Sequence, residues 1–239
     1  MNHMTVTWIK QFGPVLILIV VALGGFIFLR DVITFETLKE NRDILVEIRN
    51  DHFLWIVAGF LCFYIFIVAF SLPGASVASV TGGFLFGLTL GTVLNVLAAS
   101  TGAIVIFAVI KAGFGKMVVS KIDKLGGRPA FLKAKLQENE VSILLMLRLI
   151  PVVPFFAVNV ISALVDVKLK NFAFSTFFGI IPGALVFTWI GVGIGELFNQ
   201  SATPDLSIIW SPNIIGPLIG LSLLAGAPLI FRKFRPEEL

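Results

Sequence analysis

Charged side chains are scarce in this chain of 239 residues, of which Asp, Glu, Lys and Arg make up only 13%. About a quarter of the residues in a soluble domain are charged. Hydrophobic residues make up 57% of the chain, and the mean hydropathy is +1.00. The composition therefore excludes a soluble domain and predicts an integral membrane protein. A formal net charge of +4 is too small to indicate nucleic acid, so we interpret the Lys and Arg residues as topology signals and lipid-headgroup contacts.

Cysteine and histidine are almost absent. Cys62 is the only cysteine, which excludes an intramolecular disulfide and a cysteine-cluster metal site. Residues 121–129 read K-x6-R-P and resemble the first motif of the membrane lipid-phosphate phosphatases, but that chemistry needs one histidine as nucleophile and another as acid. The only histidines, His3 and His52, lie in no matching motif. We therefore expect that the chain is not an enzyme and holds no cofactor or metal.

Long runs without a charged residue divide the chain. A membrane-spanning helix needs about 20 apolar residues. The uncharged runs of that scale are residues 11–29, 53–110, 171–195 and 206–231, and residues 141–165 form a further run that carries one charge. We expect residues 11–29 to be a retained transmembrane helix, because residues 29–31 offer no small-residue cleavage site for a signal peptidase.

Proline and glycine interrupt two of these runs. Such breaks are tolerated at membrane depth mainly where they are buried in protein or line a cavity. In residues 141–165 each arm on either side of the break has about ten residues, and a helix of that length reaches only halfway through a bilayer core of ~30 Å. The breaks therefore predict two re-entrant hairpins, at residues 53–87 (turning at Pro73) and 141–165, which are followed by spans at residues 88–110 and 171–195.

Basic residues orient these segments. Residues 111–140 carry seven basic residues against three acidic ones, which places this connection in the cytoplasm. The N-terminus and the basic C-terminal tail fall on the same side, whereas residues 196–213 contain no basic residue and fall outside. Counting the crossings, the first hairpin enters from outside and the second from inside. This is an inverted-topology repeat of the kind that builds transport pathways.

The predicted fold is an all-α polytopic membrane protein, with an inverted repeat of two re-entrant helical hairpins, each followed by a transmembrane helix, and with flanking transmembrane helices. Residues 1–52 would hold the first transmembrane helix and an amphipathic interfacial helix. Residues 53–195 would form the core, and residues 196–239 an external loop, a C-terminal transmembrane helix and the basic tail. The interfacial helix is indicated by apolar residues at helical spacing, which are Phe35, Leu38, Leu45 and Ile48.

Arg148 is the only ionised side chain in the second hairpin. A charge in the membrane costs about 2.5 to 3.5 kcal/mol by insertion scales, so an intramembrane Arg is a functional-site hypothesis. Its planar fork suits a phosphate or carboxylate. A structural role, in which Arg148 binds freed backbone carbonyls of the opposite hairpin or extends to the cytoplasmic surface, is the alternative.

The broken helices supply the other candidate binding residues. Exposed backbone groups at the breaks, together with the side-chain amides, could meet a polar substrate. Internal satisfaction of the hairpin backbone is the alternative. The candidates are Pro73, Gly74, Asn95, Pro151, Pro154 and Asn159. Small residues are interpreted instead as close helix contacts, and these are Gly82, Gly83, Gly87, Gly91, Gly102, Ser175, Gly179, Gly183, Gly191 and Gly195.

Four motifs together resemble the SNARE-associated Golgi protein family, also called the VTT-domain or DedA superfamily. They are Pro73-Gly74, the glycine-rich residues 82–87, Arg148-x-x-Pro151-x-x-Pro154-Phe155 with Asn159, and Gly179-x-x-Pro182-Gly183. The resemblance covers about residues 53–195. It implies two opposed re-entrant hairpins and movement of lipids across the bilayer, since eukaryotic relatives are phospholipid scramblases and bacterial relatives are implicated in recycling a polyprenyl-phosphate carrier.

The chain departs from that family pattern at two points. DedA-type members carry acidic residues in the first hairpin region, whereas residues 53–110 here have none, which argues against proton coupling there. Ala163 stands where a glycine is common.

We therefore expect a multi-pass protein of the bacterial cytoplasmic (inner) membrane that moves a phospholipid or polyprenyl-phosphate headgroup between the hairpins, with Arg148 as the phosphate contact. The expected partners are membrane phospholipids or lipid phosphates, and a second copy of the chain is a further candidate. An ion-coupled carrier of a small anion or metal, and a membrane-organising protein without transport, are the alternative functions.

The predicted topology is tested by cysteine labelling in a Cys62→Ser background. A cysteine at Asp205 should label only from outside and one at Gly126 only from the cytoplasm, because the seven basic residues of residues 111–140 resist translocation. Labelling of both cysteines from the same side would contradict the inverted repeat.

Overall fold

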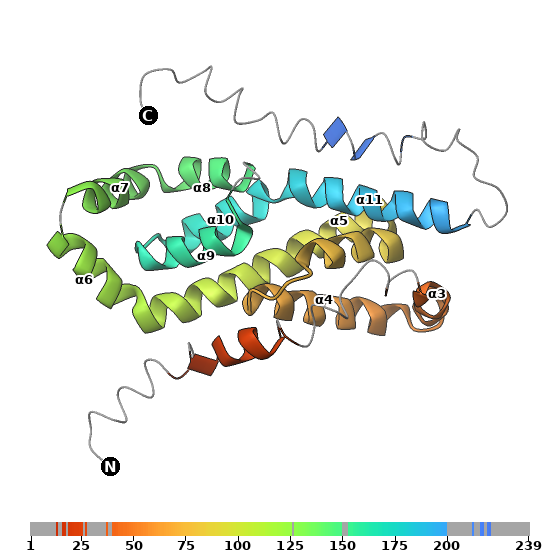
Figure 1. The fold of residues 1–239 in the computed structure, drawn as a ribbon. Coiled ribbons are helices and arrows are strands. Elements are labelled where there is room, and N and C mark those ends of the chain that lie inside the picture. Colours follow the sequence, from red (N-terminus) through yellow and green to blue (C-terminus); the bar gives the residue numbers. More distant parts are fainter. Residues whose placement is uncertain are drawn as a thin grey trace, which may run out of the picture.

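The described part of the chain is helical and contains no strand (Figure 1). The computed structural model describes residues 41–125, 127–149 and 153–199, with scattered positions between 13 and 40 and between 212 and 220. Its helices are α3 (Arg42–Asp51), α4 (Phe53–Ala69), α5 (Ala75–Ile110), a π-helical segment (Lys111–Gly115), α6 (Lys116–Leu125), α7 (Gly127–Glu138), α8 (Glu140–Leu149), α9 (Phe155–Leu164), α10 (Leu169–Gly179) and α11 (Ile181–Asn199).

Within these residues, two helical stretches are long and apolar enough to cross a membrane: Ala75–Gly115 and Leu169–Gly195. The prediction of an all-α membrane protein is thereby confirmed. The flanking span expected at residues 11–29 is described at scattered positions between 13 and 27, all of them helical, whereas most of residues 206–231 fall outside the described residues. Of the expected interfacial helix, residues 42–51 form α3, which meets α4 at an angle of 119°, whereas Phe35 and Leu38 are not described.

α4 and the first part of α5 form an antiparallel hairpin. The chain turns over residues 70–74, where Gly74 has a φ of 104° that side chains rarely allow. The hydroxyl groups of Tyr64 and Ser79 lie 2.6 Å apart across the two arms, and the rings of Phe53 and Phe86 meet edge to face at 6.2 Å between centroids. The turn at Pro73-Gly74 is therefore where the sequence predicts it.

α5 folds back on itself at Gly87, whose φ of 73° and ψ of −176° interrupt the helix. Asn95 donates from Nδ2 to the carbonyl oxygen of Ser79 at 2.8 Å, although sixteen residues of straight helix would separate the two by about 24 Å. Residues 75–86 and 88–110 therefore run antiparallel. The expectation that Gly87 serves close packing is wrong, because no described atom lies within 4 Å of a Cβ built there and its backbone makes the turn.

A second pair of arms lies at the other end of the bundle. α8 and α9 form a pair of antiparallel arms, joined by residues 150–154, of which 150–152 are not described. The residues that follow α9 contact the end of α5. Lys111, which follows α5, donates from Nζ to the carbonyl oxygen of Val167 at 2.7 Å and pairs with Asp166 at 2.9 Å. The α8–α9 pair therefore opens toward the Lys111 end of α5.

α11 marks the opposite end. Two contacts join the end of α11 to the first part of α5: the backbone of Gly191 lies close to that of Val80, and Gly195 lies close to the ring of Phe84. The α4–α5 hairpin therefore opens where α11 ends. Figure 1 shows the two pairs of arms entering the bundle from opposite ends. α10 and α11 continue each other across a break at Ile180, which precedes Pro182, a residue without a backbone N–H.

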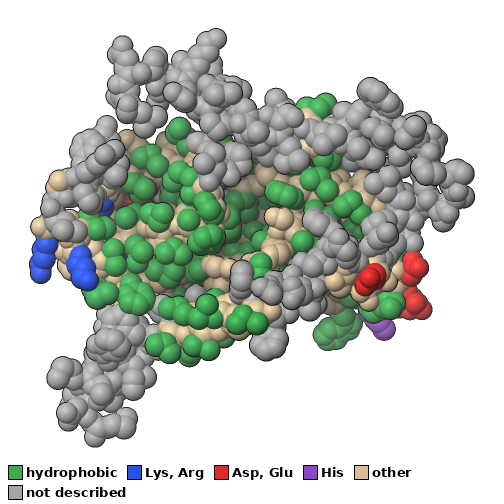
Figure 2. All heavy atoms as spheres, viewed as in Figure 1, with side chains coloured by type: hydrophobic (Ala, Val, Ile, Leu, Met, Phe, Trp, Pro, Cys, Tyr) green, Lys and Arg blue, Asp and Glu red, His purple; other side chains and the backbone are tan. Residues whose placement is uncertain are grey.

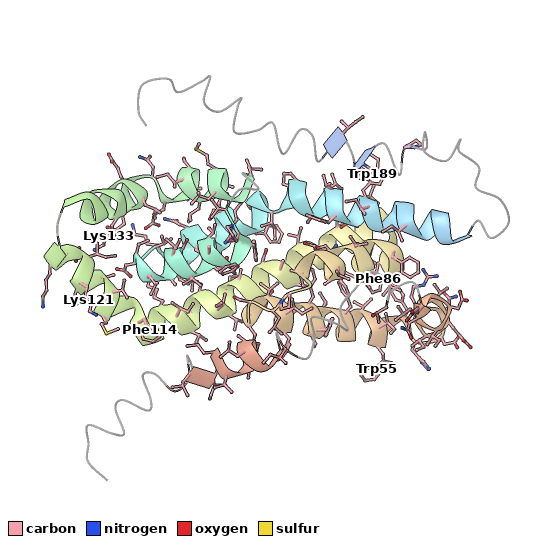
Figure 3. All side chains as sticks on the ribbon, viewed as in Figure 1. Trp55, Phe86, Phe114, Lys121, Lys133 and Trp189 are labelled. Carbon is pink, nitrogen blue, oxygen red and sulfur yellow. The ribbon has the colours of Figure 1, made fainter. Side chains whose placement is uncertain are left out.

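The connection between the halves is helical over its described residues, as α6 and α7, and Lys133 pairs with Asp123 across it at 2.7 Å. Figure 2 shows Lys and Arg side chains at this end of the molecule and Asp and Glu side chains around α3, with hydrophobic side chains between them. Figure 3 places Lys121 and Lys133 at one end, and Trp55 and Phe86 toward the other. The charges thus divide along the axis in which the helices run.

Small residues allow α11 to pack closely against the fold-back of α5. A Cβ at Gly83 would overlap the carbonyl group of Thr188, and one at Gly191 would overlap that of Val80. At Gly183 a Cβ would meet no described atom within 4 Å, so the expectation that Gly183 lies at a helix contact is wrong, because the face of α11 that packs on α5 carries Thr188 and Gly191 instead.

We predict that Gly191→Ala lowers stability by about 1–3 kcal/mol, because the added methyl group forces two backbones apart. Gly183→Ala, in the same helix, is the matched control, and it should be neutral or stabilising by up to about 1 kcal/mol. Thermal unfolding of the purified variants in detergent measures both. Equal melting temperatures for the two variants would contradict this packing.

Candidate functional site

Arg148 lies in the last turn of α8, immediately before the break between α8 and α9. A cation is favoured at a helix C-terminus, where the last carbonyl groups have no helical partner. Gly179 of α10 makes room for the side chain, since a Cβ at this position would lie 2.8 Å from the Cβ of Arg148. The expectation that Gly179 supports a close contact is therefore met at the site itself.

Two helices, α9 and α10, hold the guanidinium group. Nη2 donates to Oδ1 of Asn159 in α9 at 2.7 Å and to Oγ1 of Thr176 in α10 at 2.8 Å. Nη1 donates to the carbonyl oxygen of Phe155 at 3.4 Å. The guanidinium carbon also lies 4.6 Å from the ring centroid of Phe155 and 5.3 Å from that of Phe172, a geometry that adds cation–π attraction.

The aromatic ring of Phe172 is itself fixed. It is fully buried and stacks on Phe107 of α5, with 4.3 Å between ring centroids and 21° between ring planes. The site is thus connected to the long helix of the first half, and Arg148 sits on a rigid aromatic support.

Two buried hydrogen-bond donors at the site have no partner among the described residues: Nε of Arg148 and Nδ2 of Asn159. The side chain of Asn159 has 0% exposure, and its orientation follows from the Arg148 bond, because only its oxygen can accept. An unsatisfied buried donor costs about 1–3 kcal/mol. Donors of this kind, next to a guanidinium group, favour an anionic oxygen ligand.

Asn95 lies in a separate polar cluster. Its Nδ2 donates to the carbonyl oxygen of Ser79 and to Oγ1 of Thr188, each at 2.8 Å, and Thr188 donates in turn to the carbonyl oxygen of Ala184. No described contact joins Asn95 to Arg148. Both amide hydrogens of Asn95 are used between helices, so its observed contacts hold the fold-back of α5 against α11.

The remaining candidates lie at the helix breaks. Pro73 and Gly74 form the turn of the first hairpin, and Gly74 caps the start of α5. Pro154 precedes α9 and accepts hydrogen bonds from the backbone N–H groups of Ala157 and Val158. Pro151 falls outside the described residues. These contacts serve hairpin geometry, and a role for these residues in binding remains a prediction.

Sequence reasoning missed two polar residues. Thr176, which is fully buried, binds Arg148 across 28 residues of sequence, and only its position one helical turn before Gly179 hinted at a shared face. Glu140 was counted among the charges of the cytoplasmic connection, but it is 5% exposed. Its carboxylate accepts from the side chain of Asn171 and from the backbone N–H of Lys168, and so caps the start of α10.

Known proteins resemble this chain over most of its length. A family model described as the VTT domain matches residues 72–193. The chain is 31% identical over 201 residues to a transmembrane protein 41 homolog of Dictyostelium discoideum, an alignment that covers 83% of this chain and 58% of that protein. It is 24% identical over 198 residues to the transmembrane protein 41 homolog of Caenorhabditis elegans, covering 83% and 78% of the two chains.

Transmembrane protein 41B of Mus musculus is 26% identical over 191 residues, which cover 80% of this chain and 63% of the mouse protein. The chain therefore spans less than two thirds of the Dictyostelium and mouse relatives. No solved structure matches it.

We predict that Thr176→Val destabilises the protein by about 1–3 kcal/mol, because it removes an acceptor from a buried guanidinium group. Thr176→Ser should retain most of the stability. Thr92→Val is the matched control, since the Thr92 hydroxyl donates only within its own helix, and it should cost less. Thermal unfolding in detergent compares the three variants, and equal losses for Thr176→Val and Thr92→Val would contradict the role of Thr176.

Proposed function

The chain belongs to the VTT-domain family, and from that premise we propose that it moves a lipid phosphate headgroup between the two leaflets of a membrane, with Arg148 as the phosphate contact. The names of the relatives describe transmembrane proteins and no more. Lipid transport is thus our inference from the site and from the arrangement of the helices.

The observation that carries the proposal is the pair of buried, unpartnered donors, Nε of Arg148 and Nδ2 of Asn159. A guanidinium group that served only the hairpin would gain from satisfying every donor internally, because each buried donor without a partner lowers stability. The observed bonds use Nη2 and part of Nη1 to fix the group and leave the Nε–H donor without an acceptor. A phosphate oxygen would supply the acceptor that this donor lacks.

The arrangement of the arms supports a path for the headgroup. We take the α4–α5 pair and the α8–α9 pair as re-entrant hairpins of an inverted repeat, since they open at opposite ends of the bundle. α8 and α9 contain ten residues each, which is about 15 Å of helix and half the thickness of a bilayer core. In this interpretation the break after Arg148 lies near the midplane, where transporters bind their substrates.

The distribution of charge supports the proposed orientation. Basic residues gather at the α6 end (Figure 2), which we place in the cytoplasm, and the acidic end with α3 faces outward. We propose the bacterial cytoplasmic membrane as the location and membrane phospholipids or lipid phosphates as the partners. The chemistry is transport without a covalent step.

Arg148 variants test the proposal in vesicles that contain headgroup-labelled lipid. Lys keeps the charge but not the fork, and Ala loses both. Losing one charge-assisted hydrogen bond costs about 1.5–3 kcal/mol, or roughly tenfold or more in rate, so flipping per folded molecule should fall in the order wild type, Arg148→Lys, Arg148→Ala.

The control separates binding from folding. If Arg148 serves only the hairpin, transport should fall in proportion to the amount of folded protein, with an unchanged rate per folded molecule. Solute uptake that depends on an ion gradient, without lipid flipping, would favour a carrier instead. Absence of both activities would favour a membrane-organising protein.

A further inference from the structure

One positive charge serves the whole proposed pathway. Residues 53–110 and 171–195 contain no Asp, Glu, Lys or Arg, and residues 141–165 contain only Arg148. No histidine lies in these segments either. The site therefore presents a charge of +1 to a ligand, in surroundings where an uncompensated charge is expensive.

Among the residues that the structure describes, no other ionisable group faces the guanidinium group. On α8, Glu140 lies eight residues away, about 12 Å along the helix, and its carboxylate binds Lys168 and Asn171. On α10, Lys170 is exposed in the first turn, six residues before Thr176. α9 and residues 75–110 of α5 carry no ionisable acid or base. The charge balance at the site is thus set by Arg148 and its ligand alone.

The free donors at the site are few. Nη2 already makes two hydrogen bonds, to Asn159 and Thr176. Nε of Arg148, the second hydrogen of Nη1 and the amide hydrogens of Asn159 remain. This set matches the two unesterified oxygens of a phosphodiester, which together carry a charge of about −1. A phosphomonoester brings a third free oxygen and, near neutral pH, a charge of about −1.5 to −2.

We propose that the Arg148–Asn159 site selects a phosphate ligand with a single negative charge, and that it therefore takes a phosphodiester headgroup at any physiological pH but a phosphomonoester only in its singly protonated form. The proposal rests on the proposed function and adds the ionic class of the substrate. A monoanion makes the occupied site neutral, whereas a dianion leaves a net charge of −1 that has to be buried.

The ionisation of the ligand supplies the test. The second pKa of a phosphomonoester is about 6, so its monoanion falls on the order of 20-fold between pH 5.5 and pH 7.5. A phosphodiester does not change its charge over this range. If the site binds only monoanions, flipping of a monoester lipid should fall by a similar factor, while flipping of a diester lipid should stay constant.

Phosphatidic acid and phosphatidylmethanol are suitable probes, because they differ by one methyl ester and can carry the same labelled acyl chain. Each is incorporated in vesicles that contain the full chain, and the rate of flipping above protein-free vesicles is measured at pH 5.5 and pH 7.5. We expect the ratio of monoester to diester rates to fall on the order of 20-fold between the two pH values. A ratio that does not change with pH overturns the proposal while leaving lipid transport intact.

Other outcomes remain distinguishable. If neither lipid moves, the proposed function fails and this inference fails with it. Arg148→Lys separates the charge of the site from its geometry. The variant loses the guanidinium geometry, so its flipping rates should fall, but it keeps the +1 charge, so the pH dependence of the monoester-to-diester ratio should persist. Loss of that pH dependence in Arg148→Lys, with flipping still measurable for both lipids, would show that the selection does not follow the charge of the site.

Discussion

The structure depends on satisfying backbone carbonyl groups where apolar helices end or break, because such groups have lost their helical partners and hydrocarbon offers them no hydrogen-bond donor. A basic side chain meets this need at three breaks. Arg49 of α3 donates to the carbonyl oxygen of Leu85, just before the fold-back at Gly87. Lys111 donates to the carbonyl oxygen beyond the end of α9. Arg148 donates to that of Phe155, across the break between α8 and α9. Of the three, Arg148 alone lies in an otherwise uncharged run, and it alone combines this task with a buried donor that has no partner among the described residues.

Asn95 and Asn159 show how one residue type comes to serve two purposes. Both are fully buried. Asn95 donates both amide hydrogens to neighbouring helical segments. Its unpartnered atom is the oxygen Oδ1, which lies against Gly82. Asn159 uses its oxygen for Arg148, so its unpartnered atom is the donor Nδ2. An acceptor packed against a glycine leaves no room for a ligand, whereas a donor beside a cation attracts an anion.

The helix breaks were predictable because proline and glycine act locally. Pro73-Gly74 and Gly87 stand at the turns of the first half, and the charge-free runs indicate the apolar stretches. The contacts of the site were not predictable in the same way. Thr176 meets Arg148 only because Gly179 lets α10 approach α8 closely, and this register is set by packing between distant segments. Asn95 and Asn159 look alike in sequence, since each is an amide in an apolar run, and only their partners separate them.

The bonds that hold Arg148 are compatible with a structural role together with the binding role that we propose for the same side chain. Nη2 is fixed by Asn159 and Thr176, and the rings of Phe155 and Phe172 confine the guanidinium plane. A ligand that approaches Nε therefore meets a donor whose orientation is already set, so little side-chain entropy is lost on binding. The same bonds keep the charge in place when no ligand is present. In the pathway that we propose, which a headgroup must both enter and leave, a single prearranged charge would attract a phosphate without holding it as firmly as several charges would.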